Sequence, residues 1–150
     1  MVPLLMSFPV KAQELVSRLE SLTLAGADFR HRQHLEVAFW YLHSQGYEHG
    51  SEAIIRAIAV FTQHLGQTEK FHQTITLCWI RLVAAGMAEV GGCDTAEALI
   101  EHHPSLLDKE LPLRFYSRAR LFSDEARKQW IEPDLQPLPA IVAVIPQSRS

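Results

Sequence analysis

Three histidines stand at positions where a helix would normally bury hydrocarbon. His31 and His34 belong to the run His-Arg-Gln-His at 31–34, and His72 belongs to Phe-His-Gln-Thr-Ile-Thr at 71–76. A buried imidazole has two ring nitrogens, and each needs a partner once water is removed. The three side chains therefore predict a shared polar pocket, in which a metal ion, a substrate or a hydrogen-bond network satisfies the nitrogens.

One chemistry that this spacing supports is metal binding. His31 and His34 lie on adjacent turns of one helix, and His72 from a facing helix would complete a set of three nitrogens. Such a set leaves a coordination position for water or substrate, as catalytic zinc and iron sites require. Glu69 precedes His72 by three residues, and Glu-x-x-His occurs on the helices of di-iron bundles. Because no second Glu-x-x-His exists, the metal hypothesis is one divalent ion, Zn or Fe, with Glu69 as fourth ligand or base.

The same residues support a chemistry that needs no metal. A histidine whose pKa lies near neutrality is the commonest general acid or base. His31 or His72, oriented by Thr74, Thr76 or Tyr41, would then move a proton on a small organic molecule. The imidazoles can equally be core residues that hydrogen-bond to a backbone carbonyl, so the catalytic and structural interpretations both stay open.

Four segments with apolar residues at spacings of three and four predict the helices that position these histidines. The first ends before Gly26, and the second, which carries His-x-x-His, ends at Gly46. The third begins with Ser51 as N-cap and ends with Gly66 just beyond its last turn. The fourth opens with the motif at 71–76, has an apolar face broad enough for a central helix, and ends at Gly91 and Gly92.

Shorter helices are expected further along the chain. Asp94 begins a capping-box pattern, and Pro104 ends the helix that follows it. Residues 117–122 have the length of one or two helical turns, and Ser123 is the expected N-cap of a last helix through Trp130.

The pattern as a whole predicts an all-α fold. No alternating β pattern precedes residue 140, and the connections are short, as in a small helical bundle. Proline excludes helix from the last part of the chain. We therefore expect a single helical domain over residues 1–132 and an extended, proline-rich tail over 133–150 that packs on this domain or on a partner.

Composition narrows the setting and the partners. The net charge of −3 argues against nucleic acid, which selects for a basic excess. Arg81 interrupts the longest apolar run, so a membrane span is not expected. Two cysteines in 150 residues do not make a disulfide framework, and we expect a cytoplasmic protein. A homodimer formed through the tail or through the helix face with Trp40 is a further expectation.

Arginines gather beside aromatic residues in the second half of the chain. Arginine forks bind carboxylates and phosphates with two hydrogen bonds, so this cluster would suit an acidic small-molecule ligand. Ion pairs with carboxylates on the protein surface explain the same residues equally simply. The cluster consists of Arg114, Arg118, Arg120 and Arg127.

Several motifs resemble those of a family of small bacterial all-helical proteins. They are Phe-x-His-x-x-His-Leu at 29–35, Phe-His-x-Thr-x-Thr at 71–76, Tyr-Ser at 116–117 and Trp-Ile-Glu-Pro-Asp at 130–134. The resemblance covers most of residues 29–139.

That family often has Tyr-His-Glu-Thr-x-Thr as its second motif, whereas this chain has Phe71 and Gln73 at the two variable places. The change removes a phenol and a carboxylate from beside His72, which weakens any site that needs a carboxylate ligand there. The resemblance implies a helical fold and supports His31, His34 and His72 as the residues of interest. It implies no particular activity.

Two functional hypotheses follow from the sequence. In the first, the protein is an enzyme whose pocket of His31, His34 and His72 acts on a small molecule by metal-assisted or acid/base chemistry. In the alternative, it is a non-catalytic binding or assembly module in which the histidines are structural.

Overall fold

Helices form the framework of the protein, whose structure, a computed structural model, describes residues 12–140. No β-strand occurs in that range, which confirms the all-α prediction. Within the same range no helix is both long enough and apolar enough to cross a bilayer. After a helix over residues 12–20, the α-helices and 3-10 helices (η) are η1 (Gly26–Asp28), α2 (His31–His64), η2 (Thr68–Lys70), α3 (Gln73–Val90), α4 (Ala96–His102), η3 (Pro104–Leu107), η4 (Leu111–Arg114), α5 (Arg118–Leu121) and α6 (Asp124–Lys128).

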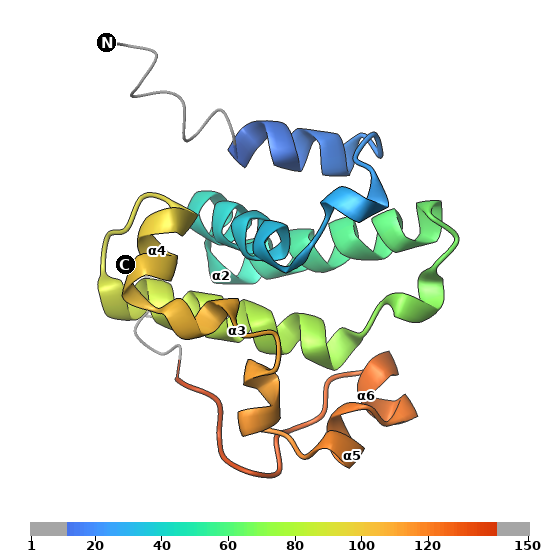
Figure 1. Cartoon of the computed structure of the whole chain (residues 1–150), viewed down its shortest axis with the longest axis vertical. Helices are drawn as coiled ribbons and strands as arrows, with labels where there is room; N and C mark the ends of the chain where they lie inside the picture. Colours follow the sequence, from blue (N-terminus) through green and yellow to red (C-terminus); the bar gives the residue numbers. More distant parts are fainter. Residues whose placement is uncertain (1–11, 141–150) are drawn as a thin grey trace.

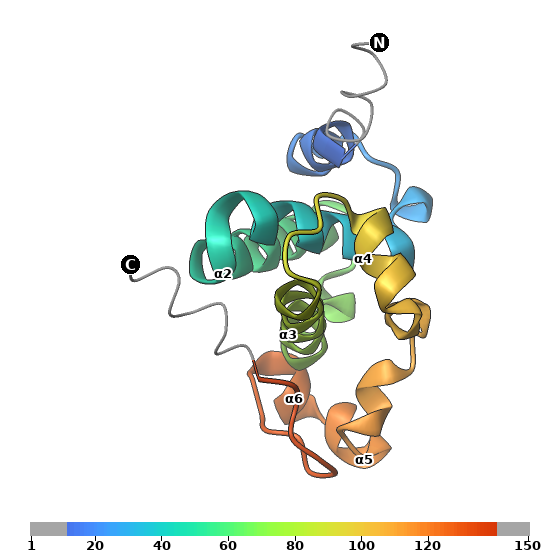
Figure 2. The same cartoon turned by 90° about the vertical axis from the view of Figure 1, so that its left-hand side faces the viewer.

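The helices are stacked in layers with α3 at the centre (Figures 1 and 2). The helix over residues 12–20 covers α2, α2 packs on α3, and α6 packs on the opposite side of α3. Helix α4 and η3 lie along one flank of α2 and α3. The central position of α3 explains its broad apolar surface, on which Cys78, Ile80 and Val83 are completely or almost completely buried.

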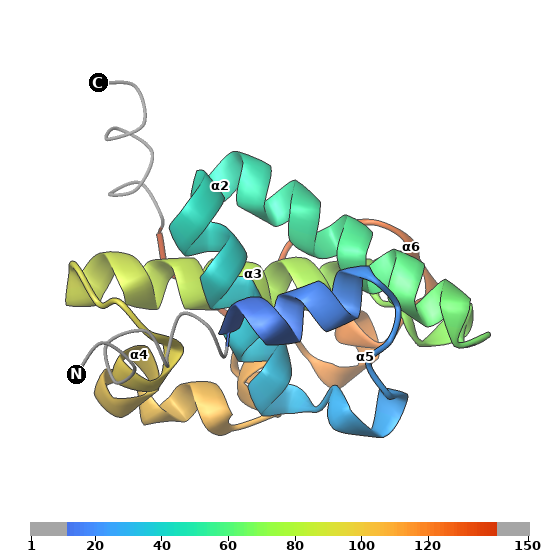
Figure 3. The ribbon, with the colours of Figure 1, turned by 90° about the horizontal axis from the view of Figure 1, so that it is seen from above.

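A kink at Gly46 divides α2 into two arms. Gly46 has φ 82° and ψ 175°, a conformation that breaks the helix and that residues with a Cβ rarely adopt. Figure 3 shows the result as a V, with the first arm before Gly46 and the second arm after it. The predicted end of a helix at Gly46 therefore corresponds to the point of the V.

The second arm begins earlier than the sequence analysis predicted. Ser51, expected as an N-cap, lies inside this arm, where its hydroxyl is buried without a hydrogen-bond partner in the described residues. Gly50, one residue earlier in the same arm, lies against the first arm. A Cβ there would lie 2.8 Å from the backbone oxygen of Tyr41, so glycine allows the two arms to approach closely.

Most predicted helix ends agree with the structure. Gly66 (φ 70°) follows α2, and Gly91 (φ 67°) ends α3, because both adopt a left-handed conformation. Ser123, the expected N-cap, begins α6, because its hydroxyl accepts the N–H of Ala126. Ser117 caps α5 in the same way by accepting the N–H of Arg120.

Three further boundaries need correction. Helix α3 begins at Gln73, so Phe71 and His72 of the motif at 71–76 precede it and His72 is its N-cap. Thr95, not Asp94, caps α4, because the Thr95 hydroxyl accepts the N–H of Ala98 at 3.1 Å. Helix α6 ends at Lys128 and not at Trp130.

Residues 129–140 follow α6 without further helix and pack back on the domain. The N–H of Ser117 donates to the Asp134 carboxylate at 2.7 Å, and the N–H of Leu135 donates to the carbonyl of Phe115 at 2.9 Å. Residues 141–150, which complete the predicted tail and contain its apolar stretch, lie outside the described residues.

Candidate functional site

A cavity of about 500 Å³ lies between the two arms of α2 and α3. The kink at Gly46 directs the arms apart, and α3 passes beneath the space between them, with both arms on the same side of it. Apolar side chains from all three helical segments form its walls, among them Leu35 and Ala38 from the first arm, Ile58 and Phe61 from the second arm, and Ile75 and Trp79 from α3. His31, His34 and His72 all line this cavity.

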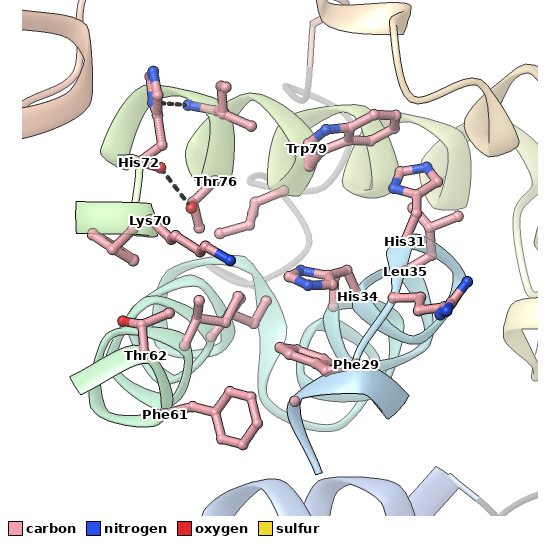
Figure 4. A pocket seen from close by; sticks show the side chains of 18 of the residues that line it. Phe29, His31, His34, Leu35, Phe61, Thr62, Lys70, His72, Thr76 and Trp79 are labelled. Carbon is pink, nitrogen blue, oxygen red and sulfur yellow. Dashed lines mark hydrogen bonds between the residues drawn. The ribbon is translucent and has the colours of Figure 1, made fainter. Parts of the chain in front are cut away.

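His34 faces the space between the arms (Figure 4). Its ring stacks on Phe29 with the ring centroids 3.9 Å apart and the planes 14° from parallel. Burial, and secondarily the neighbouring His31, lowers the pKa of His34 to about 4, with the backbone of Phe29 acting in the opposite direction. The His34 imidazole is therefore neutral at pH 7 and can both donate and accept a hydrogen bond.

Among residues 12–140, His31 has a hydrogen-bond partner at one of its two ring nitrogens. Its Nε2 lies 2.8 Å from the carbonyl oxygen of Leu106, and its ring meets Trp79 edge-on at a centroid distance of 4.5 Å. Because a carbonyl only accepts, Nε2 carries the proton, and the lone pair of the neutral ring is on Nδ1. This arrangement, in which a backbone carbonyl orients the ring and the second nitrogen keeps its lone pair, is the one that a general base needs.

His72 has both ring nitrogens occupied. Nδ1 accepts the N–H of Ile75 at 3.1 Å and so caps α3, while Nε2 donates to the carbonyl of Leu121 at 2.8 Å. Figure 4 shows the His72 ring turned away from His34. Burial is the main cause that lowers the pKa of His72, and Arg127 adds to it. His72 therefore contributes to the cavity wall, but its ring nitrogens serve the fold.

The three hydroxyl groups predicted beside the histidines have different positions. Thr74 does not line the cavity, and its hydroxyl donates to the carbonyl of Gln129 at 2.7 Å. Thr76 lines the cavity, and its hydroxyl donates to the backbone oxygen of His72 at 2.7 Å. Tyr41 does not reach the cavity, because its buried side chain turns towards the helix over residues 12–20 and its hydroxyl donates to Glu20. Burial and this contact raise the pKa of Tyr41. The predicted role of Tyr41 beside the histidines is therefore wrong.

The predicted metal-ligand set of His31, His34, His72 and Glu69 is not assembled in the structure. Within residues 12–140 no three His, Cys, Asp or Glu side chains converge as metal ligands. The hydrogen bonds of His72 explain this result, since neither of its nitrogens is left to bind a metal. Glu69 is exposed on η2 and is not part of the cavity wall.

Three basic residues at the cavity were not among the predicted site residues. Arg30, Lys70 and Lys109 line it together with the histidines. Lys70 directly precedes the motif at 71–76, and that adjacency was the available signal. For Lys109 the sequence holds no comparable signal, because the path of η3 and the residues after it brings this side chain to the cavity.

The arrangement as a whole is an apolar cavity with two accessible imidazoles and a basic margin. It can hold an organic molecule and exchange a proton with it at His31. No protein-family model, curated protein or solved structure matches this chain.

Proposed function

We propose that the protein is an enzyme that binds a small organic molecule in this cavity and moves a proton on it, with His31 as the general base or acid. The observation that carries the proposal is a single cavity whose apolar walls include the rings of His31 and His34. Its volume of about 500 Å³ falls within the usual range of small-molecule sites. Apolar walls with a few polar groups are also typical of such sites.

The two imidazoles have different roles in this proposal. His31 takes a proton at Nδ1 while the carbonyl of Leu106 holds Nε2–H and stabilises the charged ring. His34, with a pKa of about 4, is too weak a base to hold a proton at pH 7. It therefore orients the ligand by a hydrogen bond and by the flat surface that it shares with Phe29.

The setting that we propose is the cytoplasm. Cys78 and Cys93 are both free, although Cys93 is only partly buried. An oxidising compartment favours paired cysteines, whereas a reducing one leaves them as thiols.

A non-catalytic binding module is the second candidate. The structural use of His72 favours it, because one of the three cavity histidines serves the helix cap and the contact with α5. The same cavity would then hold a ligand without changing it. The two candidates predict the same binding site and differ in turnover.

Binding can be tested by nuclear magnetic resonance with histidine side chains labelled and a library of small organic fragments. We expect bound fragments to shift the ring signals of His31 and His34. The substitutions His31→Gln and His34→Gln should each lower the affinity of the protein for these fragments. His49, exposed on α2 away from the cavity, provides the matched control, and His49→Gln should bind as the wild type does. The proposal would be overturned if no fragment of the library changed the resonance signals of a residue that lines the cavity.

Turnover separates the enzyme from the binding module. Fragments that bind would be incubated with the protein and analysed by mass spectrometry or, for proton exchange, in deuterated water. We expect wild-type protein to exchange or convert a bound fragment and His31→Gln to lose that activity while still folding. Binding without any conversion would identify the non-catalytic module.

A further inference from the structure

Arginine and lysine side chains line the cavity, and aspartate and glutamate side chains of the described residues do not. The three basic residues are Arg30, Lys70 and Lys109. The chain as a whole carries a net charge of −3, so this local excess runs against the average. Of the three lysines within residues 12–140, two lie here, and Lys128 is the exception.

These cations have no carboxylate partner in the part of the chain that the structure describes. Its ion pairs instead join Arg32 to Glu36, His103 to Glu89, and Arg114 to Asp108. Arg30 donates from Nε to the backbone oxygen of Ala27, which leaves its charge uncompensated. Like charges that line one cavity repel each other and create a positive potential, which raises the local concentration of anions.

The positions of the charges and of the apolar groups divide the cavity into two regions. Arg30, Lys70 and Lys109 are exposed, so they form its margin. Figure 4 shows the Lys70 side chain extending towards the space in front of His34. Aromatic rings line the interior, namely Phe29, Phe61, Phe71 and Trp79.

We infer that the ligand is an organic acid whose carboxylate binds Lys70, Arg30 and Lys109 at the margin while its aromatic or branched apolar body fills the interior. This inference rests on the proposed function and names the class of its ligand. A carboxylate gains charge-assisted hydrogen bonds from ammonium and guanidinium groups. The apolar body gains from burial against the walls and from contact with aromatic rings.

The single N–H of the neutral His34 ring is directed to the backbone of Phe29, so its other nitrogen is an acceptor and the carboxylate is bound by the three basic side chains. His31 contacts Trp79, one of the aromatic rings of the interior, so it is the histidine that lies beside the apolar body of the acid. A highly polar ligand such as a free sugar fits the cavity poorly, because few neutral polar side chains line it, chiefly Thr62, Gln67 and Thr76.

Pairs of acids and their amides test the ligand class directly. Calorimetric titration of the full chain would compare phenylacetate, 3-phenylpropionate and 1-naphthylacetate with the corresponding amides, which have the same shape without the charge. We expect at least one acid to bind about tenfold more tightly than its amide, a difference typical of one charge-assisted contact. Raising the salt concentration should weaken binding of the acid and leave binding of the amide unchanged.

Variants at the margin assign the effect to the named residues. Lys70→Met keeps the length of the side chain without its charge. It should therefore lower the affinity for the acids about tenfold and leave the affinity for the amides unchanged. Lys70→Arg should restore binding of the acids. Lys128 is exposed on α6 and does not line the cavity, so Lys128→Met is the matched control and should bind the acids as the wild type does.

The outcomes separate this inference from the proposed function. Amides or other neutral fragments that bind in the cavity as tightly as the acids, with no effect of Lys70→Met, would overturn the acid class and leave the cavity as a binding site. If neither acids, amides nor the fragment library bind there, the proposed function itself fails.

Discussion

The cavity histidines differ in how their ring nitrogens are used. His72 has both nitrogens in hydrogen bonds to the backbone, and His31 has one. His34 is held mainly by stacking on Phe29, and its burial favours the neutral ring. Three residues of one type on one cavity wall thus have three roles, because the atoms around each ring differ.

The low pKa of His34 predicts a loss of stability in acid. The folded protein binds the His34 proton with a pKa of about 4, whereas the unfolded chain binds it near 6.5. Stability from the neutral ring is complete above pH 6.5, falls as the pH drops to about 4, and changes no further below that. The difference corresponds to about 3 kcal/mol of unfolding free energy. Urea denaturation across this pH range measures it.

A substitution isolates the contribution of His34 from that of the other histidines. His34→Gln should reduce the loss between pH 6.5 and pH 4 by up to about 3 kcal/mol. His49→Gln, at an exposed position, should retain the loss of the wild type. An unchanged pH dependence in His34→Gln would show that the ring is not kept neutral by burial.

At the scale of the elements, the kink in α2 creates the site. A straight helix of the length of α2 would carry His34 and Phe61 far apart along one axis, since each residue adds 1.5 Å. The break at Gly46 brings both arms to the same side of α3, and the cavity lies between them. Gly50 then permits the close approach of the second arm to Tyr41.

The kink predicts that Gly46 tolerates no side chain. Gly46→Ala should lower the unfolding free energy by about 1–3 kcal/mol, the cost of a glycine-only backbone conformation. Nothing lies within 4 Å of the added Cβ, so the cost comes from the backbone and not from a clash. Gln45→Ala, at the exposed neighbouring position, is the control and should change stability little. Urea denaturation measures both variants, and equal unfolding free energies for Gly46→Ala and Gln45→Ala would contradict this explanation.

At the scale of the whole molecule, a buried polar contact joins the segment after α6 to the centre of the fold. The Thr74 hydroxyl donates to the carbonyl of Gln129 at 2.7 Å and accepts the N–H of Ile131 at 3.3 Å. The Tyr116 hydroxyl donates to the carbonyl of Ile131 at 2.7 Å. Thr74 and Tyr116 are both fully buried, so these bonds are shielded from water.

This contact predicts the effect of a shape-conserving substitution. Thr74→Val should lower the unfolding free energy by about 2 kcal/mol, because it leaves the buried N–H of Ile131 and the partly buried carbonyl of Gln129 without their partner. Thr74→Ser keeps the hydroxyl and should cost less. Hydrogen exchange should also become faster at the amide of Ile131 in Thr74→Val. Equal stability of the Val and wild-type proteins would exclude the proposed role of these bonds.

The ends of the helices and the faces that they bury were predictable from the sequence. Gly46, Gly66 and Gly91 mark helix breaks because their backbone conformations exclude most other residues. Ser117 and Ser123 mark helix starts because a hydroxyl can accept a free N–H. These are local effects, so they can be recognised in a short stretch of sequence.

The tertiary structure alone decided which nitrogens of the cavity remain available. The carbonyl that holds His31 comes from Leu106, 75 residues later in the chain, and the one that holds His72 comes from Leu121. Helical periodicity placed His31 and His34 on the inward face of α2, but it could not identify His72 as the N-cap of α3, the remote carbonyl partners or the basic margin with Lys109. A hydrogen bond requires two groups to meet within about 3 Å. Only the packing of distant segments fixes positions to that precision.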